Sequence, residues 1–383
     1  MPHRSSALVG LLVLGVAACG PSADASGASA RPTSILATAS PAATSSLPSV
    51  STTPVPTIAS GWRIVPTPTD AGTGRARDVA SYEGALIAVG ASEAGHGFIW
   101  GSADGEAWLS IAGSTPLDGV ILDTVAVGDP GVVAAGWNDA GAVALFSADG
   151  TSWFSHEIPA SHPGSSIVSV AWRDGHFVAV GGGGEPLAAV SWISTDGRAW
   201  TRVPIIEENH QASLTSVAVG PDSFVAGGMQ LGHPATWSSP DGASWTVADL
   251  PGSLADDPGR IRYTGGHFFF PIGGDAMWVG TDGRHWTKVT VPGFGVGVFD
   301  VIAIRGGFVA VGRTSGNNQA GIVATWAGDG MQWRLAPPDP TLTKGLPSTL
   351  ILSPDGSSLI GVGLAGSGEG AFILVNPSAL LAR

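Results

Sequence analysis

From Gly61 onward, short apolar runs alternate with turns rich in glycine and aspartate, and the pattern repeats along the chain. Apolar runs of about five residues, bounded by Gly and Asp, are typical of β-strands and too short for helices. Each repeat is therefore predicted to hold four short antiparallel strands. In one repeat these strands cover residues 168–172, 176–181, 189–193 and 199–203.

The turn before the fourth strand carries the same motif in six repeats, with a small residue, then Asp-Gly, then Trp three residues after the Gly. Asp-Gly suits a tight hairpin turn, because Gly adopts the positive φ that such a turn needs. The motif recurs at intervals of 45, 47, 45, 41 and 47 residues, a period typical of propeller blades. Its aspartates are Asp104, Asp149, Asp196, Asp241, Asp282 and Asp329.

The two ends of this region supply one more repeat. Residues 349–352, 359–363 and 371–375 predict three strands without a fourth, whereas 61–66 predict a fourth strand without the other three. Joining them closes the ring and leaves no open sheet edge. We predict an all-β fold, a seven-bladed β-propeller of four-stranded antiparallel blades that is closed by an N-terminal strand joining the C-terminal blade.

The Asp and Trp residues of the motif are predicted to be structural. The Asp carboxylate can accept hydrogen bonds from backbone N–H groups of its own turn, and the Trp ring can pack between blades. Calcium or sugar binding by these turns is the alternative, but each turn offers one carboxylate, far short of the 6–8 oxygens that calcium takes. We therefore expect no metal and no cofactor. The tryptophans are Trp62, Trp108, Trp153, Trp200, Trp245, Trp286 and Trp333.

The six motifs resemble the Asp-box of BNR-type propellers, in a form shortened by one residue between Asp and Gly. That family includes sialidases, sortilin-type receptor domains and photosystem II assembly factors. The resemblance covers about 270 residues and implies the propeller fold. It implies little about function, because propellers carry many unrelated activities.

Residues 1–18 resemble the signal peptide of a bacterial lipoprotein. An apolar run of 14 residues follows Arg4, too short to span a bilayer. It ends in Val16-Ala17-Ala18-Cys19, which is similar to a lipobox, and this resemblance implies cleavage before Cys19 and its acylation. Cys19 is the only cysteine, so it cannot form an internal disulfide. An ordinary signal with a chance cysteine is the alternative.

Acylation would anchor the chain in a bacterial cell envelope, on the outer side of the cytoplasmic membrane or in an outer membrane. Residues 19–60 are rich in Ser, Thr, Ala and Pro, and we expect a disordered tether that leads to the propeller of residues 61–383. The 57 Gly and 28 Pro exclude a long-helix protein, and the 14 Trp exclude disorder throughout. The net charge of −13 argues against a nucleic-acid partner.

Candidate ligand-binding residues gather where the first strands begin and the second strands end, at one mouth of the central channel. Trp137 is placed in a loop, where its ring offers a flat face to a sugar or peptide or folds back over the sheet. Two roles are open for the charged residues. They bind a ligand, or they form a solvated ring in which they pair with each other. The candidates are Arg77, Asp78, Asp123, Trp137, Arg260, Asp300 and Arg313.

The leading hypothesis for function is a monomeric, non-catalytic binding or scaffold module for a protein, peptide or glycan. The alternative is a sialidase-like exo-glycosidase, for which the resemblance implies three arginines around a substrate carboxylate, a Tyr nucleophile and an Asp acid/base. Tyr82 and Tyr263 are the only tyrosines, and both are predicted at strand ends away from the mouth. Asp78, Asp123 and Asp300 leave a two-carboxylate mechanism open. No zinc-spaced histidines, P-loop lysine or G-x-S-x-G elbow is present.

Overall fold

The computed structural model describes residues 61–69, 72, 74–159, 163–183, 188–205, 211–250, 258–315, 321–327, 332–365 and 371–376. The chain divides into two units, Met1–Ser51 and Thr52–Arg383, and every described residue belongs to the second. The predicted signal peptide, Cys19, the predicted tether and Asp329 lie outside the described residues.

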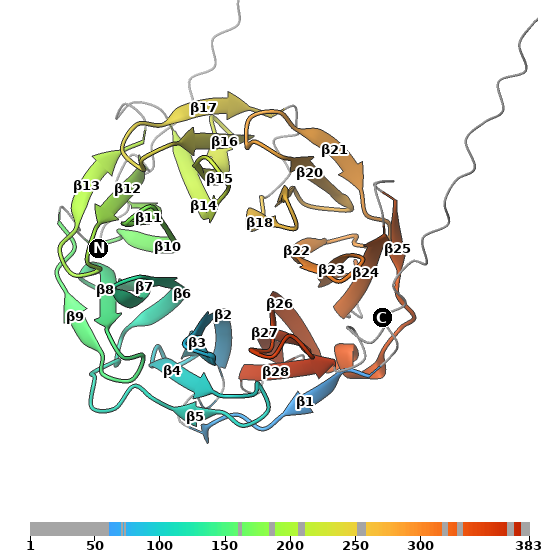
Figure 1. Cartoon of the computed structure of the whole chain (residues 1–383), viewed down its shortest axis with the longest axis horizontal. Helices are drawn as coiled ribbons and strands as arrows, with labels where there is room; N and C mark the ends of the chain where they lie inside the picture. The colour runs from blue at the N-terminus through green and yellow to red at the C-terminus, as the bar shows by residue number, and fades with distance from the viewer. Residues whose placement is uncertain are drawn as a thin grey trace, which may run out of the picture. The chain divides into compact units, whose positions relative to one another are not determined.

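The described strands pair into seven four-stranded antiparallel sheets, arranged around a central channel (Figure 1). The predicted β-propeller of four-stranded antiparallel blades is thereby confirmed. The first three sheets contain β2 (Gly74–Tyr82), β3 (Ala85–Ser92), β4 (Gly97–Ser102) and β5 (Leu109–Ser110); β6 (Ile121–Gly128), β7 (Gly131–Asn138), β8 (Gly141–Ser147) and β9 (Phe154–His156); and β10 (Ser166–Arg173), β11 (His176–Gly183), β12 (Ala188–Ser194) and β13 (Thr201–Pro204).

The next three sheets follow in the same order around the channel. They contain β14 (Ala212–Val219), β15 (Phe224–Gln230), β16 (His233–Ser239) and β17 (Thr246–Asp249); β18 (Arg262–Thr264), β19 (His267–Pro271), β20 (Ala276–Gly280) and β21 (Thr287–Thr290); and β22 (Gly297–Ile304), β23 (Gly307–Arg313), β24 (Gly321–Ala327) and β25 (Trp333–Leu335).

The last sheet joins the two ends of the described chain. Its strands are β26 (Gly345–Leu352), β27 (Leu359–Ala365), β28 (Ala371–Asn376) and β1 (Arg63–Val65), with β1 paired antiparallel to β28. The Asp339 carboxylate, at the start of the 3-10 turn Pro340–Thr343, accepts hydrogen bonds from the backbone N–H groups of Gly61 (2.9 Å) and Trp62 (3.2 Å). The inner strand β26 contacts β2, so the N-terminal strand and the last three strands together complete the ring.

The Asp-Gly turns are held by their own side chains. Asp196 accepts hydrogen bonds from the backbone N–H groups of Arg198 and Ala199, both at 2.8 Å. Ser194 donates its hydroxyl to the same carboxylate oxygen and accepts the N–H of Gly197 at 2.9 Å. These bonds, led by the one from Ala199, lower the pKa of Asp196. The turn therefore favours the ionised carboxylate, and equivalent bonds hold the turns at Asp104, Asp149, Asp241 and Asp282.

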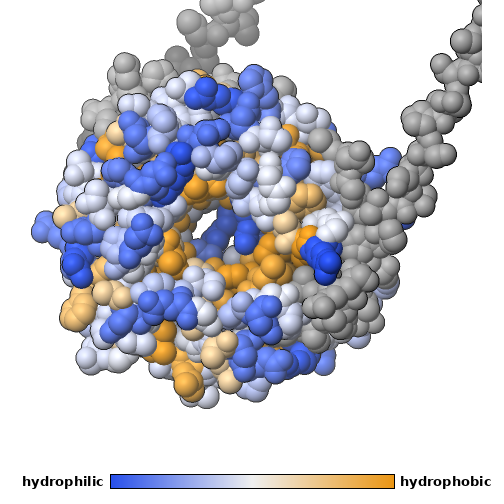
Figure 2. Space-filling model, viewed as in Figure 1, coloured by the Kyte–Doolittle hydropathy of each residue, from blue (hydrophilic) through white to orange (hydrophobic). Residues whose placement is uncertain are grey.

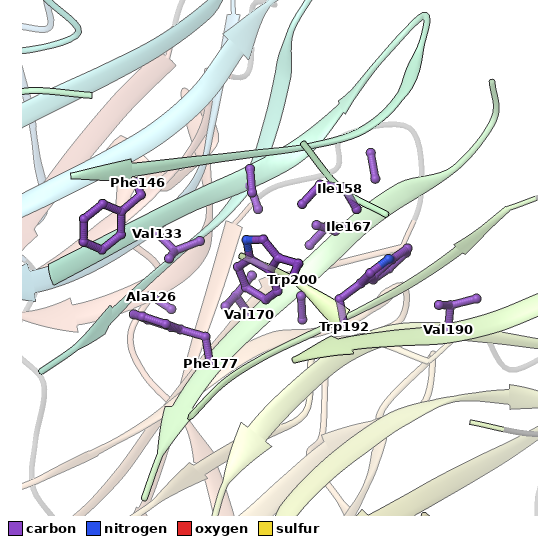
Figure 3. Close-up of a cluster of buried hydrophobic side chains, with 14 residues drawn as sticks. Ala126, Val133, Phe146, Ile158, Ile167, Val170, Phe177, Val190, Trp192 and Trp200 are labelled. Atoms are coloured by element: carbon purple, nitrogen blue, oxygen red, sulfur yellow. The ribbon is translucent and has the colours of Figure 1, made fainter. Parts of the chain in front are cut away.

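The motif also seals one sheet against the preceding one. Gly197 has φ +72°, and a Cβ there would lie 2.5 Å from the Phe146 ring of the preceding sheet. Trp200 packs in the same interface with Phe146 and Phe177 (Figure 3). Burial of such large rings is a major source of stability. Five of the seven motif tryptophans are buried and two, Trp245 and Trp286, are partly buried.

The motif tryptophans were predicted inside the fourth strands, and here the structure differs slightly. Trp62, Trp108, Trp153, Trp200, Trp245 and Trp286 each lie directly before their strand, and Trp333 begins β25. The reason is the turn itself, since the Trp108 and Trp245 indoles donate to the carbonyls of Gly105 and Gly242, both at 2.9 Å. Within the described part of the chain, no helix has the length and apolar character needed to cross a bilayer.

Candidate functional site: the mouth of the central channel

The inner strands carry a β-bulge at one shared position. The register of β2, β6, β10, β14, β22 and β26 with their neighbours shifts by one residue there. A bulge leaves an extra residue unpaired and re-aims the side chains beside it. The residue directly after each bulge is polar and buried, and these residues are Asp78, Thr124, Ser169, Ser216, Asp300 and Thr349.

These side chains bond to the backbone of the next sheet around the ring. One Asp78 carboxylate oxygen accepts hydrogen bonds from the Thr124 hydroxyl and the Val125 N–H, both at 3.0 Å. The Thr124 hydroxyl in turn accepts the N–H of Val170 at 3.2 Å. The pattern continues around the ring. The N–H groups of Ile261 and Leu350 donate to Ser216 (2.6 Å) and Asp300 (2.7 Å). The hydroxyls of Ser169 and Thr349 donate to the carbonyls of Val217 (3.5 Å) and Arg77 (3.2 Å).

Arg260 occupies the corresponding position in the fifth sheet, just before β18. The N–H of Ile261, the residue after it, donates to the Ser216 hydroxyl, as the N–H of Val125 after Thr124 donates to Asp78. We call the seven residues Asp78, Thr124, Ser169, Ser216, Arg260, Asp300 and Thr349 the polar belt. The hydrophilic residues inside the central opening are visible in Figure 2.

Three ion pairs join the charged residues of the mouth. Arg260 Nη1 lies 2.5 Å from Asp78 Oδ1, although their sheets are not neighbours, so this pair spans the channel. Arg262 Nη1 lies 2.6 Å from Asp300 Oδ2, and Arg77 Nη1 lies 2.7 Å from Asp123 Oδ1. The structure therefore brings together five of the seven predicted candidates and adds Arg262, which the sequence did not single out.

The pKa values show how these charges depend on one another. Burial disfavours the charged form of Arg260, but Asp78 and Asp300 outweigh it and raise its pKa. Burial raises the pKa of Asp300 despite Arg262 and the backbone N–H of Leu350, which favour the carboxylate. Burial likewise raises the pKa of Asp123 against the opposing effect of Arg77. The ion pairs thus outweigh burial at Arg260 and offset it only in part at Asp300 and Asp123.

Trp137 lies on a strand, which corrects the prediction that placed it in a loop. It is the penultimate residue of β7 and pairs with Ile121, because the second strand runs two residues past its apolar core. Its side chain is 39% exposed, and its indole hydrogen-bonds to Asp123, which opposes the rise in pKa that burial causes at that carboxyl. A cavity of about 390 Å³ lies beside it, lined also by Asn138, Asp139 and residues 164–166.

Two further arginines lie on the mouth side of their strands. Arg75, near the start of β2, is exposed and makes no ion pair or hydrogen bond within the described part of the chain. Its partial burial and the positive charge of Arg77 lower its pKa. Arg313, a predicted candidate, ends β23 and joins none of the three ion pairs. Within the described part of the mouth, Arg75 and Arg313 thus lie outside the three ion pairs.

The tyrosines lie where a glycosidase of the sialidase type could not use them. Tyr82 ends β2, at the opposite end from Arg75, and donates its hydroxyl to the carbonyl of Ala148 at 2.8 Å. Tyr263 packs against Phe268, with ring centroids 4.7 Å apart. Among the described residues, no group of three or more His, Cys, Asp or Glu side chains could hold a metal ion.

Comparisons with known proteins support the fold alone. No protein-family model and no curated protein matches the chain. A catalytically inactive virginiamycin B lyase from Staphylococcus aureus with quinupristin is similar in structure, with TM-score 0.63 and 11% identity over 82% of this chain and 98% of that one. YCF48 from Cyanidioschyzon merolae has TM-score 0.58 and 15% identity over 83% and 99%. YCF48 bound to D1 peptide has TM-score 0.60 and 14% identity over 84% and 97%.

The channel-spanning ion pair predicts a large loss of stability for Asp78→Ala. The substitution strands Arg260 and the Val125 N–H without their acceptor, and breaking a buried pair in this way costs about 3–5 kcal/mol. Asp118→Ala is the matched control, because Asp118 is 92% exposed in its pair with His96 and such pairs contribute about 0–1 kcal/mol. Urea unfolding measures both. Equal, small losses of unfolding free energy in the two variants would contradict the assignment of mutually paired channel charges.

Proposed function

We propose that this chain is a membrane-anchored, extracytoplasmic β-propeller that binds a protein or peptide at the channel mouth and performs no catalysis. One observation supports the proposal above the others. The mouth carboxylates and guanidinium groups are committed to one another, whereas the Trp137 ring and the Arg75 guanidinium stay exposed beside them.

The pairing argues against an acid/base role for these carboxylates. A general acid or base needs to reach the proton that it transfers, at about 2.6–3.2 Å. Asp78 accepts bonds from Arg260, Thr124 and two backbone N–H groups, which occupies both of its oxygens. Asp300 accepts from Arg262 and from two backbone N–H groups, and its side chain is fully buried. A substrate would have to displace these partners first.

The exposed groups suit recognition of a polypeptide. An indole offers a broad apolar face and an N–H, and a guanidinium binds a carboxylate through two parallel hydrogen bonds. The complex of YCF48 with D1 peptide supports this proposal, because a propeller of similar fold binds a peptide. An aromatic face also stacks on sugars, so failure to select any peptide that depends on Trp137 would favour a glycan ligand instead.

The test is selection of peptides from a displayed random library against the full chain. Trp137→Ala should weaken the selected peptides at least tenfold, whereas Phe154→Ala should not, because Phe154 is 64% exposed on the outer strand β9. Peptide binding that is unchanged in Trp137→Ala would contradict the assignment of the binding site to the channel mouth. Turnover of aryl glycosides or sialosides that disappears in Arg260→Ala would favour the glycosidase instead.

We also propose that acylation of Cys19 supplies the anchor, on the basis of the Val16-Ala17-Ala18-Cys19 motif. Two or more acyl chains hold a protein stably at a membrane. Cys19→Ala should therefore move the protein from the membrane fraction to the soluble fraction, and the tether variant Ser26→Ala should not. Fractionation followed by immunodetection measures this. Unchanged membrane retention of Cys19→Ala would count against lipidation.

A further inference from the structure

A cavity of about 460 Å³ lies between the first sheet, β2–β5, and the second, β6–β9. It is at the end of the strands opposite the channel mouth, because it is bordered by the end of β2, the start of β3 and the two Asp-Gly turns. We call it the interblade cavity. Its apolar surface comes mainly from Tyr82, Leu86, Ile87, Leu109 and Ile111.

The first sheet carries a glycine on the face that the cavity borders, where the second sheet carries a phenylalanine. Ile87, Gly101 and Leu109 pair across β3, β4 and β5, so they share the sheet face that the cavity borders. In the second sheet the position of Gly101 is taken by Phe146, which pairs with Val133 and Phe154 in the same way. A glycine therefore stands where the next sheet has a phenylalanine ring, and the Ile111 side chain covers it, 3.1 Å from where a Cβ would lie.

At two of the equivalent interfaces an arginine occupies the matching position, whereas the first sheet has Glu106 and the fourth has Ala243 there. The residue after the motif glycine is Arg198 in the third sheet, and its guanidinium lies 4.4 Å above the Phe146 ring of the second. In the fifth sheet it is Arg284, which donates from Nε to Ser238 of the fourth at 3.1 Å. In the second sheet it is Thr151, which lines the interblade cavity and is too short to cross it.

The charge around the cavity is negative. Glu83, Asp104 and Asp149 belong to its lining, which includes no Lys or Arg. Burial raises the pKa of Tyr82, and the charges of Glu83 and Asp149 raise it further. The site therefore combines an apolar floor with an acidic border. That combination suits a long side chain with an aliphatic stem and a cationic head.

We propose that the interblade cavity binds an arginine side chain of a partner polypeptide. The stem lies along Ile87 and Ile111, and the guanidinium lies at the border formed by Asp104 and Asp149. Arginine suits this position better than lysine, because its planar group stacks on an aromatic ring such as Tyr82 and pairs with carboxylates through two bonds. The partner supplies the group that Arg198 and Arg284 supply from within the chain at their own interfaces.

The test uses a capped pentapeptide, acetyl-Gly-Gly-Arg-Gly-Gly-amide, titrated into the full chain labelled at isoleucine δ1 methyl groups. We expect NMR shifts at Ile87 and Ile111 and none at Ile302, which lies in the sixth sheet. The same peptide with citrulline, a neutral isostere of arginine, should bind at least tenfold more weakly. Equal binding of the two peptides, or shifts absent from Ile87 and Ile111, would overturn the proposal.

Thr151→Arg provides a matched variant, because it restores the side chain found in the third and fifth sheets. It should shift the Ile87 and Ile111 methyl signals without ligand and abolish binding of the arginine peptide. Ala243→Arg is the control, since Ala243 follows the motif glycine of the fourth sheet and adds the same charge elsewhere. Peptide binding that survives Thr151→Arg would refute the site. Trp137→Ala should leave this binding intact, which separates the test from that of the channel mouth.

Discussion

The hydrogen bond from a polar-belt side chain to the backbone of the next sheet is the interaction on which the ring depends. The bulges in the inner strands interrupt the strand ladder where the sheets meet most closely, and buried backbone groups need a partner there. Asp78, Thr124 and Ser216 supply one for N–H groups of the following sheet. Arg260 instead crosses the channel to Asp78. Polar groups that hold the sheets in place already have hydrogen-bond partners, which supports the proposed binding role of the mouth.

Much of the architecture could be predicted because its signals are local. An Asp-Gly pair predicts a tight turn, and a Trp at a fixed distance after it predicts a contact between sheets, so repeats could be counted along the chain. Pairing between the two ends could be predicted because the C-terminal end lacked a fourth strand and the N-terminal end lacked the other three. In the structure, β1 does pair with β28. The turn at Asp355 shows the limit of this reasoning. Ser353 donates to it at 2.7 Å as in the Asp-box turns, but it lies between the first two strands and Leu359 stands in place of Trp.

The candidate site was predicted only in part, because the register and the exact ends of the strands could not be predicted from the sequence. The start of each first strand pointed to Arg77, Asp78, Asp123, Arg260 and Asp300, which the structure joins in ion pairs. The bulges could not be predicted, because an alternating pattern does not show where one residue is skipped. Trp137 was placed in a loop because β7 runs two residues past its apolar core, and the partner of Asp300, Arg262, was missed. The interblade cavity likewise needs the register that sets Gly101 beside Ile87.

The central claim is that the channel charges are fixed by one another, while Arg75 stays exposed and joins none of the ion pairs among the described residues. NMR of the arginine side chains in ¹⁵N-arginine-labelled protein tests it directly, through rotation about the bond between Nε and the guanidinium carbon. The account predicts slow rotation and separate Nη signals for Arg260 and Arg262, held by Asp78 and Asp300, and a single averaged signal for Arg75. An averaged signal for Arg260, like that of Arg75, would contradict the closed channel and return its carboxylates to the list of catalytic candidates.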